Sequence, residues 1–182
     1  MEILVAGVGN ELKGDDAFGI RAVQCLADDP RRPESCVTQE TGIGGIHLVQ
    51  ELMRGYDSLI VFDAFDRGGS PGDLWLLEPD LPKAEEMTHR ERRDYFADVH
   101  YATPIRALTL AQSVGALPPL VRIIGCQPEK LDTFDTAMHQ TVAAAVPRAV
   151  DMAIEVMKHL KKRPKNEFKP ENPNLLEEKN GQ

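Results

Sequence analysis

The segment EILVAGVGNELKGDDAFGI, residues 2–20, decides the fold that this sequence predicts. Its apolar start, residues 2–6, is typical of a buried β-strand, and the glycines that follow suit a tight exit from that strand. A helix is expected over residues 16–27, because apolar side chains recur there at three- and four-residue spacing and Asp15 or Asp16 is a favourable N-cap. The segment therefore predicts a strand, a glycine turn and a helix in succession.

The rest of the chain alternates strand-like and helix-like segments. This alternation predicts an α/β fold with right-handed crossovers and a mostly parallel sheet that helices cover on both faces. Residues 1–160 are expected to form a single domain, and residues 161–182 a disordered polar tail. Further strands are expected near residues 36–40, 58–62, 74–77 and 120–125. Further helices are expected after Gly45 (Ile46, Val49, Leu52 and Met53 inward), from Thr103-Pro104 (Ile105, Leu108 and Gln112 on one face), and over about 137–160, with a kink at Pro147.

Composition excludes several classes of protein. Hydrophobic residues make up 42% of the 182-residue chain, which is enough for a globular core, and no apolar run reaches the length of a membrane span. The formal net charge of −8 disfavours nucleic acid as a partner, because an acidic protein repels phosphate backbones. The start of the chain lacks the basic residues and long apolar core of a signal peptide, so a cytoplasmic protein is expected. The three scattered cysteines predict neither a disulfide framework nor a zinc knuckle.

Residues 78–99 differ from their surroundings, because they are charged, contain two prolines and include Arg90, Arg92 and Arg93. Long connections in compact domains are often functional lids or binding loops. The arginines would then steer an acidic stretch of a partner towards the protein. The alternative is a solvated surface helix without a specific role.

Acidic residues follow three of the predicted strands. Asp15 and Asp16 follow the first, Glu40 ends the second and Asp63 ends the third. In open α/β sheets, ligands bind beyond the carboxyl ends of the strands, so these acids are expected to converge at one edge of the sheet. The alternatives are a helix cap for Asp15 or Asp16 and an ordinary turn residue for Asp63.

Two familiar motifs are excluded at this edge. A dinucleotide-binding loop would need a third glycine where Leu12 stands, and the two adjacent acids would repel a pyrophosphate. A nucleotide-binding domain is therefore disfavoured. The sequence also lacks the H-E-x-x-H and G-x-S-x-G motifs of common hydrolases, so it shows no standard protease machinery.

Among the five histidines, His100 is the candidate ligand, because it lies just before the third helix, where the chain returns towards the sheet edge. The alternative is a structural or solvated histidine. Two carboxylates and an imidazole form a ligand set that suits nickel, zinc or similar ions. Three protein ligands with open positions would make a reactive or substrate-bridging site rather than a closed structural one.

The stretch Gly7-Val8-Gly9-Asn10 followed by Gly14-Asp15-Asp16-Ala17-Phe18-Gly19 resembles the N-terminal signature of the hydrogenase maturation proteases. Asp16 stands where several members carry Glu, so the carboxylate is retained with a shorter reach. The resemblance continues in order through Thr41–Leu48, Phe62-Asp63-Ala64, His100 and Ile124–Glu129, and it spans roughly residues 3–160.

This resemblance implies a three-layer α/β/α fold with a twisted, mostly parallel sheet. It implies an endopeptidase that removes the C-terminal extension of a nickel-iron hydrogenase large-subunit precursor after nickel insertion. The metal-binding positions of the family correspond to Asp16, Asp63 and His100, which are also the expected catalytic residues, and the nickel is expected to arrive with the precursor. Asp15 and Asp66 are further candidates for an acid or base. The alternative function is a non-catalytic nickel-sensing chaperone or checkpoint for the same precursor.

Overall fold

The computed structural model describes residues 1–43, 45–83, 86–96, 103–131 and 137–162. In this part of the chain, five strands form one sheet in the order β2-β1-β3-β5-β4. Strands β2, β1, β3 and β5 are parallel, and β4 runs antiparallel to β5, which confirms the mostly parallel sheet. The strands are β1 (Ile3–Val8), β2 (Cys36–Gly42), β3 (Ser58–Ala64), β4 (Leu74–Leu77) and β5 (Val121–Cys126). The helices are the 3₁₀ turn η1 (Gly14–Ala17), α1 (Phe18–Ala27), α2 (Gly45–Leu52), α3 (His89–Phe96), α4 (Pro104–Ser113) and α5 (Gln140–Lys162).

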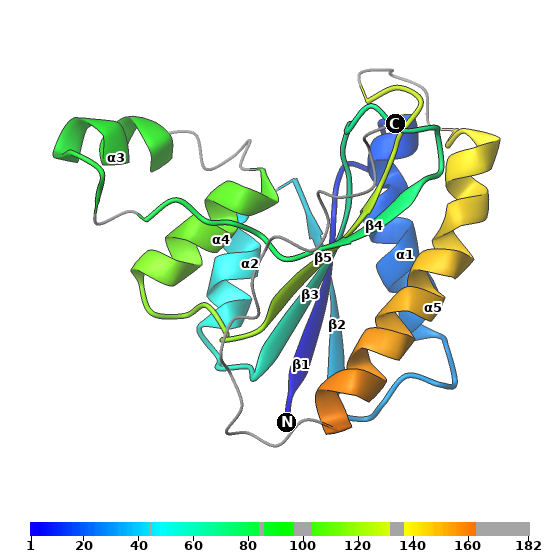
Figure 1. The fold of residues 1–182 in the computed structure, drawn as a ribbon, viewed down its shortest axis with the longest axis horizontal. Helices are drawn as coiled ribbons and strands as arrows, with labels where there is room; N and C mark the ends of the chain where they lie inside the picture. The colour runs from blue at the N-terminus through cyan, green and yellow to red at the C-terminus, as the bar shows by residue number, and fades with distance from the viewer. Residues whose placement is uncertain (44, 84–85, 97–102, 132–136, 163–182) are drawn as a thin grey trace, which may run out of the picture.

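Helices cover both faces of the sheet, as the three-layer prediction requires. Helices α1 and α5 lie on one face, and α2 and α4 lie on the other (Figure 1). Alternate residues of β1 point to opposite faces, so Ile3 and Val5 pack against α1 and α5 while Leu4 and Ala6 pack against α2 and α4. Both faces are buried over the central strands, which explains why β1 and β3 are buried along their whole length and largely apolar. Within the described helices, none is long and apolar enough to cross a membrane.

Glycines allow the first helix to approach the sheet closely. A Cβ on Gly19 would lie 2.1 Å from the carbonyl oxygen of Val8 and 2.4 Å from that of Phe62, so α1 packs directly on the backbone of β1 and β3. Gly9 has φ +136°, and a Cβ there would lie 1.8 Å from the carbonyl oxygen of Asp16. These contacts bring η1 against the ends of β1 and β3, which positions Asp16.

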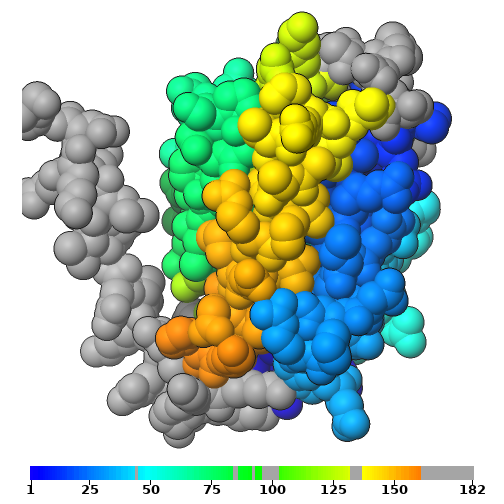
Figure 2. Space-filling model, turned by 90° about the vertical axis from the view of Figure 1, so that its right-hand side faces the viewer, coloured from blue at the N-terminus to red at the C-terminus, as the bar shows by residue number. Residues whose placement is uncertain are grey.

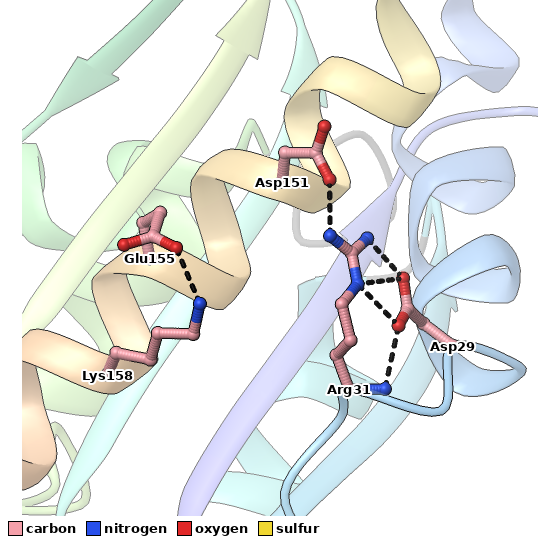
Figure 3. A network of polar contacts seen from close by, with 5 residues as sticks. All are labelled: Asp29, Arg31, Asp151, Glu155 and Lys158. Carbon is pink, nitrogen blue, oxygen red and sulfur yellow. Dashed lines mark hydrogen bonds and ion pairs between the residues drawn. The ribbon is translucent and has the colours of Figure 1, made fainter.

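An ion-pair cluster links the loop after α1 to helix α5. Figure 2 shows α5, in yellow and orange, running beside the blue of α1 and the loop that follows it. In that loop, the Arg31 guanidinium binds the carboxylate of Asp29 at 2.6 Å and that of Asp151 on α5 at 2.8 Å (Figure 3). The hydrogen bonds from Arg31 lower the pKa of Asp29 to about 2. All three residues are partly exposed, so we expect this cluster to order the loop more than to stabilise the fold.

Several helix details differ from the sequence prediction. Helix α1 begins at Phe18 with no side-chain cap, so neither Asp15 nor Asp16 is its N-cap. Helix α2 ends at Leu52, which leaves Met53 68% exposed, and Leu48 fills the core instead. Gln112 is exposed on α4. Helix α5 continues through Pro147 to Lys162, two residues beyond the predicted domain end, and residues 163–182 of the predicted tail lie outside the described part of the chain.

The predicted connection at residues 78–99 contains a helix, α3, that stands apart from the sheet in Figure 1. A capping box starts it: the Thr88 backbone N–H donates to Glu91 Oε2 at 2.8 Å, and the Glu91 N–H donates to Thr88 Oγ1 at 3.2 Å. Its Tyr95 ring contacts the guanidinium of Arg106 on α4, at 5.3 Å from the ring centroid. Arg90 and Arg93 are exposed and each pairs with Asp94, which fits both a solvated helix and a steering surface, so the role of this segment stays a prediction.

A paired-carboxylate cavity as the candidate active site

Asp16 and Asp63 lie near each other at the carboxyl ends of β1 and β3. Asp63 is the penultimate residue of β3 and is 8% exposed, and Asp16 lies in η1 and is half-buried. Burial, and then the nearby charge of Asp16, raise the pKa of Asp63 well above its usual value, although the Ala64 backbone hydrogen bond acts the other way. The two carboxylates therefore converge at this edge, as predicted. Two negative charges so close together repel each other unless one carboxylate is protonated or a cation lies between them.

Both carboxylates line a cavity of about 870 Å³. The cavity extends from the ends of β1 and β3 over the face that α2 and α4 cover, because its apolar wall includes Val8, Ile105 and Ile123, which belong to the core of that face or pack against it. The rest of the apolar wall consists of Ile43, Ala64, Phe65, Leu77, Pro79, Pro104 and Leu131. The polar lining comes from Asn10, Lys13, Arg67, Glu78, Asp80 and Thr103. The site is therefore an apolar groove with a carboxylate pair at one edge of the sheet.

The third predicted ligand, His100, lies outside the described residues. Thr103 and Pro104, which follow it closely in the sequence, line the cavity. Among the residues that the structure describes, no group of three His, Cys, Asp or Glu side chains is arranged to hold a metal ion. Asp16 and Asp63 thus supply two carboxylate ligands, and the role of His100 stays a prediction.

Asp15 holds the backbone around the site together instead of capping α1. Its carboxylate is 4% exposed and accepts hydrogen bonds from three backbone N–H groups: Glu129 at 2.8 Å, Lys130 at 3.4 Å and His139 at 2.6 Å. The side chains of Glu129 and His139 also pair, at 2.5 Å between Oε2 and Nε2. Asp15 therefore joins η1 to both ends of the segment between β5 and α5, and an acid or base role for it stays a prediction.

Asp66 lies in the turn after β3. Hydrogen bonds from the Gln127 side chain and the Gly68 backbone, both at 2.8 Å, lower the pKa of Asp66. An ionised carboxylate of this kind does not suit a general acid, and a role for Asp66 as a base stays a prediction. Gln127 is 5% exposed and was not expected from the sequence, because its role depends on a turn that lies far away along the chain.

Glu40 lies apart from the carboxylate pair, contrary to the predicted convergence. It lines a neighbouring cavity of about 690 Å³, together with Glu11, Thr41 and His47. The two cavities share Gly9, Asn10 and Ile43, which form the ridge between them. Glu40 is separated because β2 is the edge strand, and β1 lies between it and β3.

The cysteines do not supply a nucleophile to the cavity. Cys126 is fully buried at the end of β5, in the core that faces α1 and α5, and burial raises the pKa of its thiol to about 12. Cys36 is buried and Cys25 is exposed. The fold and the site thus define a three-layer α/β/α protein with a carboxylate pair, and no cysteine, in the lining of its cavity.

Comparison with known proteins places this class within one family. The model of the family described as "Hydrogenase maturation protease" matches residues 20–156. The hydrogenase expression/formation protein HoxM of Azotobacter vinelandii is 36% identical over 85% of this chain and 72% of its own length. HupD of Rhizobium leguminosarum bv. viciae, described in the same words, is 32% identical over 86% of this chain and 74% of its own length.

Solved structures agree with this assignment. The hydrogenase maturating endopeptidase HybD from E. coli matches with a TM-score of 0.69 at 24% identity. The match covers 88% of this chain and 94% of the HybD chain, and it supports the fold. A hydrogenase 2 maturation peptidase from a Thaumarchaeota archaeon matches with a TM-score of 0.60 at 30% identity. This match covers 86% of this chain and 98% of the peptidase chain. The protein belongs to the hydrogenase maturation protease family, and the enzyme class that the sequence resemblance implied is confirmed.

Proposed function

We propose that this protein is the endopeptidase that removes the C-terminal extension from a nickel-iron hydrogenase large-subunit precursor after nickel insertion. The observation that supports the proposal most directly is the pairing of Asp16 with the buried Asp63 in the large cavity of a chain that belongs to this protease family. A cavity of about 870 Å³ is as large as pockets that enclose small ligands. It therefore suits a short peptide segment rather than a folded subunit.

The nickel of the precursor is the group that we expect the carboxylate pair to recognise. Asp16 and Asp63 are adjacent oxygen donors, and the raised pKa of Asp63 means that the metal-free pair favours holding a proton. A cation would replace that proton, because metal ligands bind in their deprotonated form. Together with His100, the pair would form a carboxylate and imidazole set of the kind that binds nickel.

The residues around the cavity define what the chain itself contributes to cleavage. The apolar wall excludes water from the peptide segment, and Asp16 and Asp63 orient it at the sheet edge. A metal bound there would polarise the scissile carbonyl or activate a water molecule. If nickel serves only to dock the precursor, a carboxylate of this edge would act as the base towards water.

The test is cleavage of a purified, nickel-loaded precursor, followed by gel shift and by mass spectrometry of the released peptide. Asp63→Ala and Asp16→Ala should lower the rate of processing at least about 100-fold, because each removes a group that acts on the scissile bond or its metal. The control is Glu155→Ala, an exposed acid on α5 that pairs with Lys158, and it should process at the wild-type rate.

The same experiment separates the protease from the checkpoint. A wild-type protein that binds the nickel-loaded precursor but releases no peptide would support the non-catalytic checkpoint and refute the protease proposal. Equal processing by wild type and Asp63→Ala would refute the site assignment.

A further inference from the structure

Phe65 forms part of the cavity wall immediately beyond the carboxylate pair. It follows Asp63 by two residues, lines the cavity and packs against the apolar core under α2 and α4. Its ring stacks on Trp75 of β4, with 6.0 Å between the ring centroids and an interplanar angle of 23°. Trp75 of the edge strand β4 thus supports the Phe65 ring, which lines the cavity.

Gly125 of β5 determines where the Phe65 ring lies. A Cβ on Gly125 would be 2.1 Å from Cζ and 2.2 Å from Cε1 of that ring, and real Cβ atoms essentially never approach other heavy atoms to under 3.0 Å. The tip of the ring therefore rests directly on the backbone of β5. Glycine is needed at this position for space, since its backbone is that of an ordinary strand residue.

Hydrogen bonds hold the backbone on either side of the ring. The Phe65 N–H donates to the carbonyl oxygen of Cys126 at 3.1 Å. The side-chain oxygen of the buried Gln127 accepts from the backbone N–H groups of Arg67 at 2.9 Å and Gly69 at 3.2 Å. These bonds fix the backbone that carries Phe65, while the packing against Gly125 and Trp75 restricts the ring itself.

The walls around this ring select the chemistry of what enters. Leu77, Ile105 and Ile123 line the same cavity and offer no hydrogen-bonding side chain. An aliphatic side chain that packs against Phe65 and these three residues would gain from burial. A charged or amide side chain on this apolar part of the wall would lose hydration, and its replacement partners would have to come from the polar lining, such as Lys13 or Arg67.

We propose that Phe65, seated on Gly125, is a specificity-determining residue: its ring sets the size of the aliphatic side chain of the precursor's C-terminal segment that fits beside Asp16 and Asp63. The inference rests on the proposed function, because it concerns the same cavity and the same substrate. An apolar pocket of defined size discriminates between side chains that differ by one methylene by about 10- to 200-fold.

The experiment measures kcat/KM for precursors in which each residue that flanks the cleaved bond is in turn Ala, Leu or Phe. At each position, kcat/KM for the precursor with the bulkiest side chain is divided by kcat/KM for the precursor with Ala. The Phe65→Ala enzyme should show a ratio about tenfold or more above that of the wild-type enzyme at one of these positions. Phe65→Leu, which retains most of the packing, should shift the same ratio in the same direction by less. The control is Leu76→Ala, which truncates an exposed β4 side chain outside the cavity lining and should leave the ratios unchanged.

A second pair of variants tests the dependence on Gly125. Gly125→Ala should displace the ring and reduce processing of precursors with bulky side chains, and Phe65→Ala combined with Gly125→Ala should restore it, because the clash no longer exists. Failure of the double variant to exceed Gly125→Ala on any precursor would overturn the proposed coupling.

Two outcomes distinguish the failure of this inference from the failure of the proposed function. If wild type cuts its precursor and every Phe65 variant changes kcat/KM by the same factor for all side chains, Phe65 only supports the fold and the specificity role is wrong. If wild type cuts no precursor at all, both the proposed function and this inference are wrong.

Discussion

The buried carboxyl of Asp63 is the residue on which the site depends. An acid at the end of an apolar strand costs free energy unless it is protonated, paired or bound to a cation. Its neighbour Asp16 makes the ionised form still less favourable. We infer that the fold tolerates this cost because the pair is used for binding.

The first prediction concerns the stability of the metal-free protein. The folded-state pKa of Asp63 lies above its ordinary value of 3.8. The protonated carboxyl therefore makes its full contribution to stability below pH 3.8, and this contribution is lost as the pH rises through the raised folded-state pKa. Asp63→Asn is neutral throughout, so its gain in free energy of unfolding over wild type should grow across this window and then level off. Urea unfolding in the presence of a chelator measures it, and a pH-independent difference would contradict the cause given.

The second prediction concerns the thiols. Cys25 should react with a thiol reagent at pH 8 in the folded protein, whereas Cys126 should not, because it is buried and its pKa is raised to about 12. Mass spectrometry of the labelled protein locates the modified residue. Cys126→Ala should lower the free energy of unfolding by about 1 kcal/mol and leave processing unchanged. Loss of processing with an intact fold would identify a cysteine nucleophile and refute the carboxylate site.

At the scale of elements, the site is assembled from turns that distant elements hold in place. The η1 turn rests on Gly9 and is joined through Asp15 to the segment that leads into α5. The exit of β3 is held by Gln127, which follows β5. Neighbouring parallel strands provide the common edge, and partly buried hydrogen bonds fix the turns that project from it.

The third prediction concerns Asp15. Asp15→Ala should lower the free energy of unfolding by about 2 kcal/mol, because it leaves three partly buried backbone N–H groups without their charged acceptor. Asp15→Asn should destabilise as well, since its amide NH₂ would face an N–H donor. Asp28→Ala, an exposed acid at the end of α1, is the matched control and should stay within about 0.5 kcal/mol of wild type in urea unfolding. A loss no larger than that of the control would show that these hydrogen bonds contribute little.

The fourth prediction concerns helix α3. Reversing Arg90, Arg92 and Arg93 to Glu should slow precursor association about tenfold at low ionic strength if this helix steers an acidic stretch of the partner. Added salt should shrink the difference, and metal affinity should not change. Stopped-flow association over a series of salt concentrations measures this. Unchanged association and processing at low salt would leave α3 as a solvated helix without a steering role.

At the scale of the whole molecule, two helical layers cover the sheet, and the cavity that contains Asp16 and Asp63 lies on the face that α2 and α4 cover. The α1 and α5 layer is closely packed on the sheet, and Arg31 links the loop after α1 to α5. The α2 and α4 layer shares its apolar core with the cavity wall. The cavity therefore lies on the α2 and α4 face of the sheet, which is the face that we expect to bind the precursor.

The fifth prediction concerns the end of the chain. Truncation after Lys162 should leave the unfolding temperature within about 1 °C of wild type and should leave processing intact, because the polar composition of residues 163–182 offers no apolar side chains in a pattern that a core would bury. Calorimetry and the precursor cleavage assay measure both quantities. A fall of several degrees would show that the tail packs on the domain.

The sequence alone determined the layers, the five strands and the positions of Asp16 and Asp63, because apolar periodicity and the ends of parallel strands are local properties of the chain. It did not determine the partners of Asp15 and Gln127, which lie more than fifty residues away from them. It also did not determine the apolar cavity. Because β4 runs antiparallel to β5, Leu77 at the end of β4 pairs with Ile123 of β5, and both residues line the cavity. Only the tertiary structure decided these features, because long-range contacts depend on which strands become neighbours and on the space that glycines such as Gly9 and Gly125 leave.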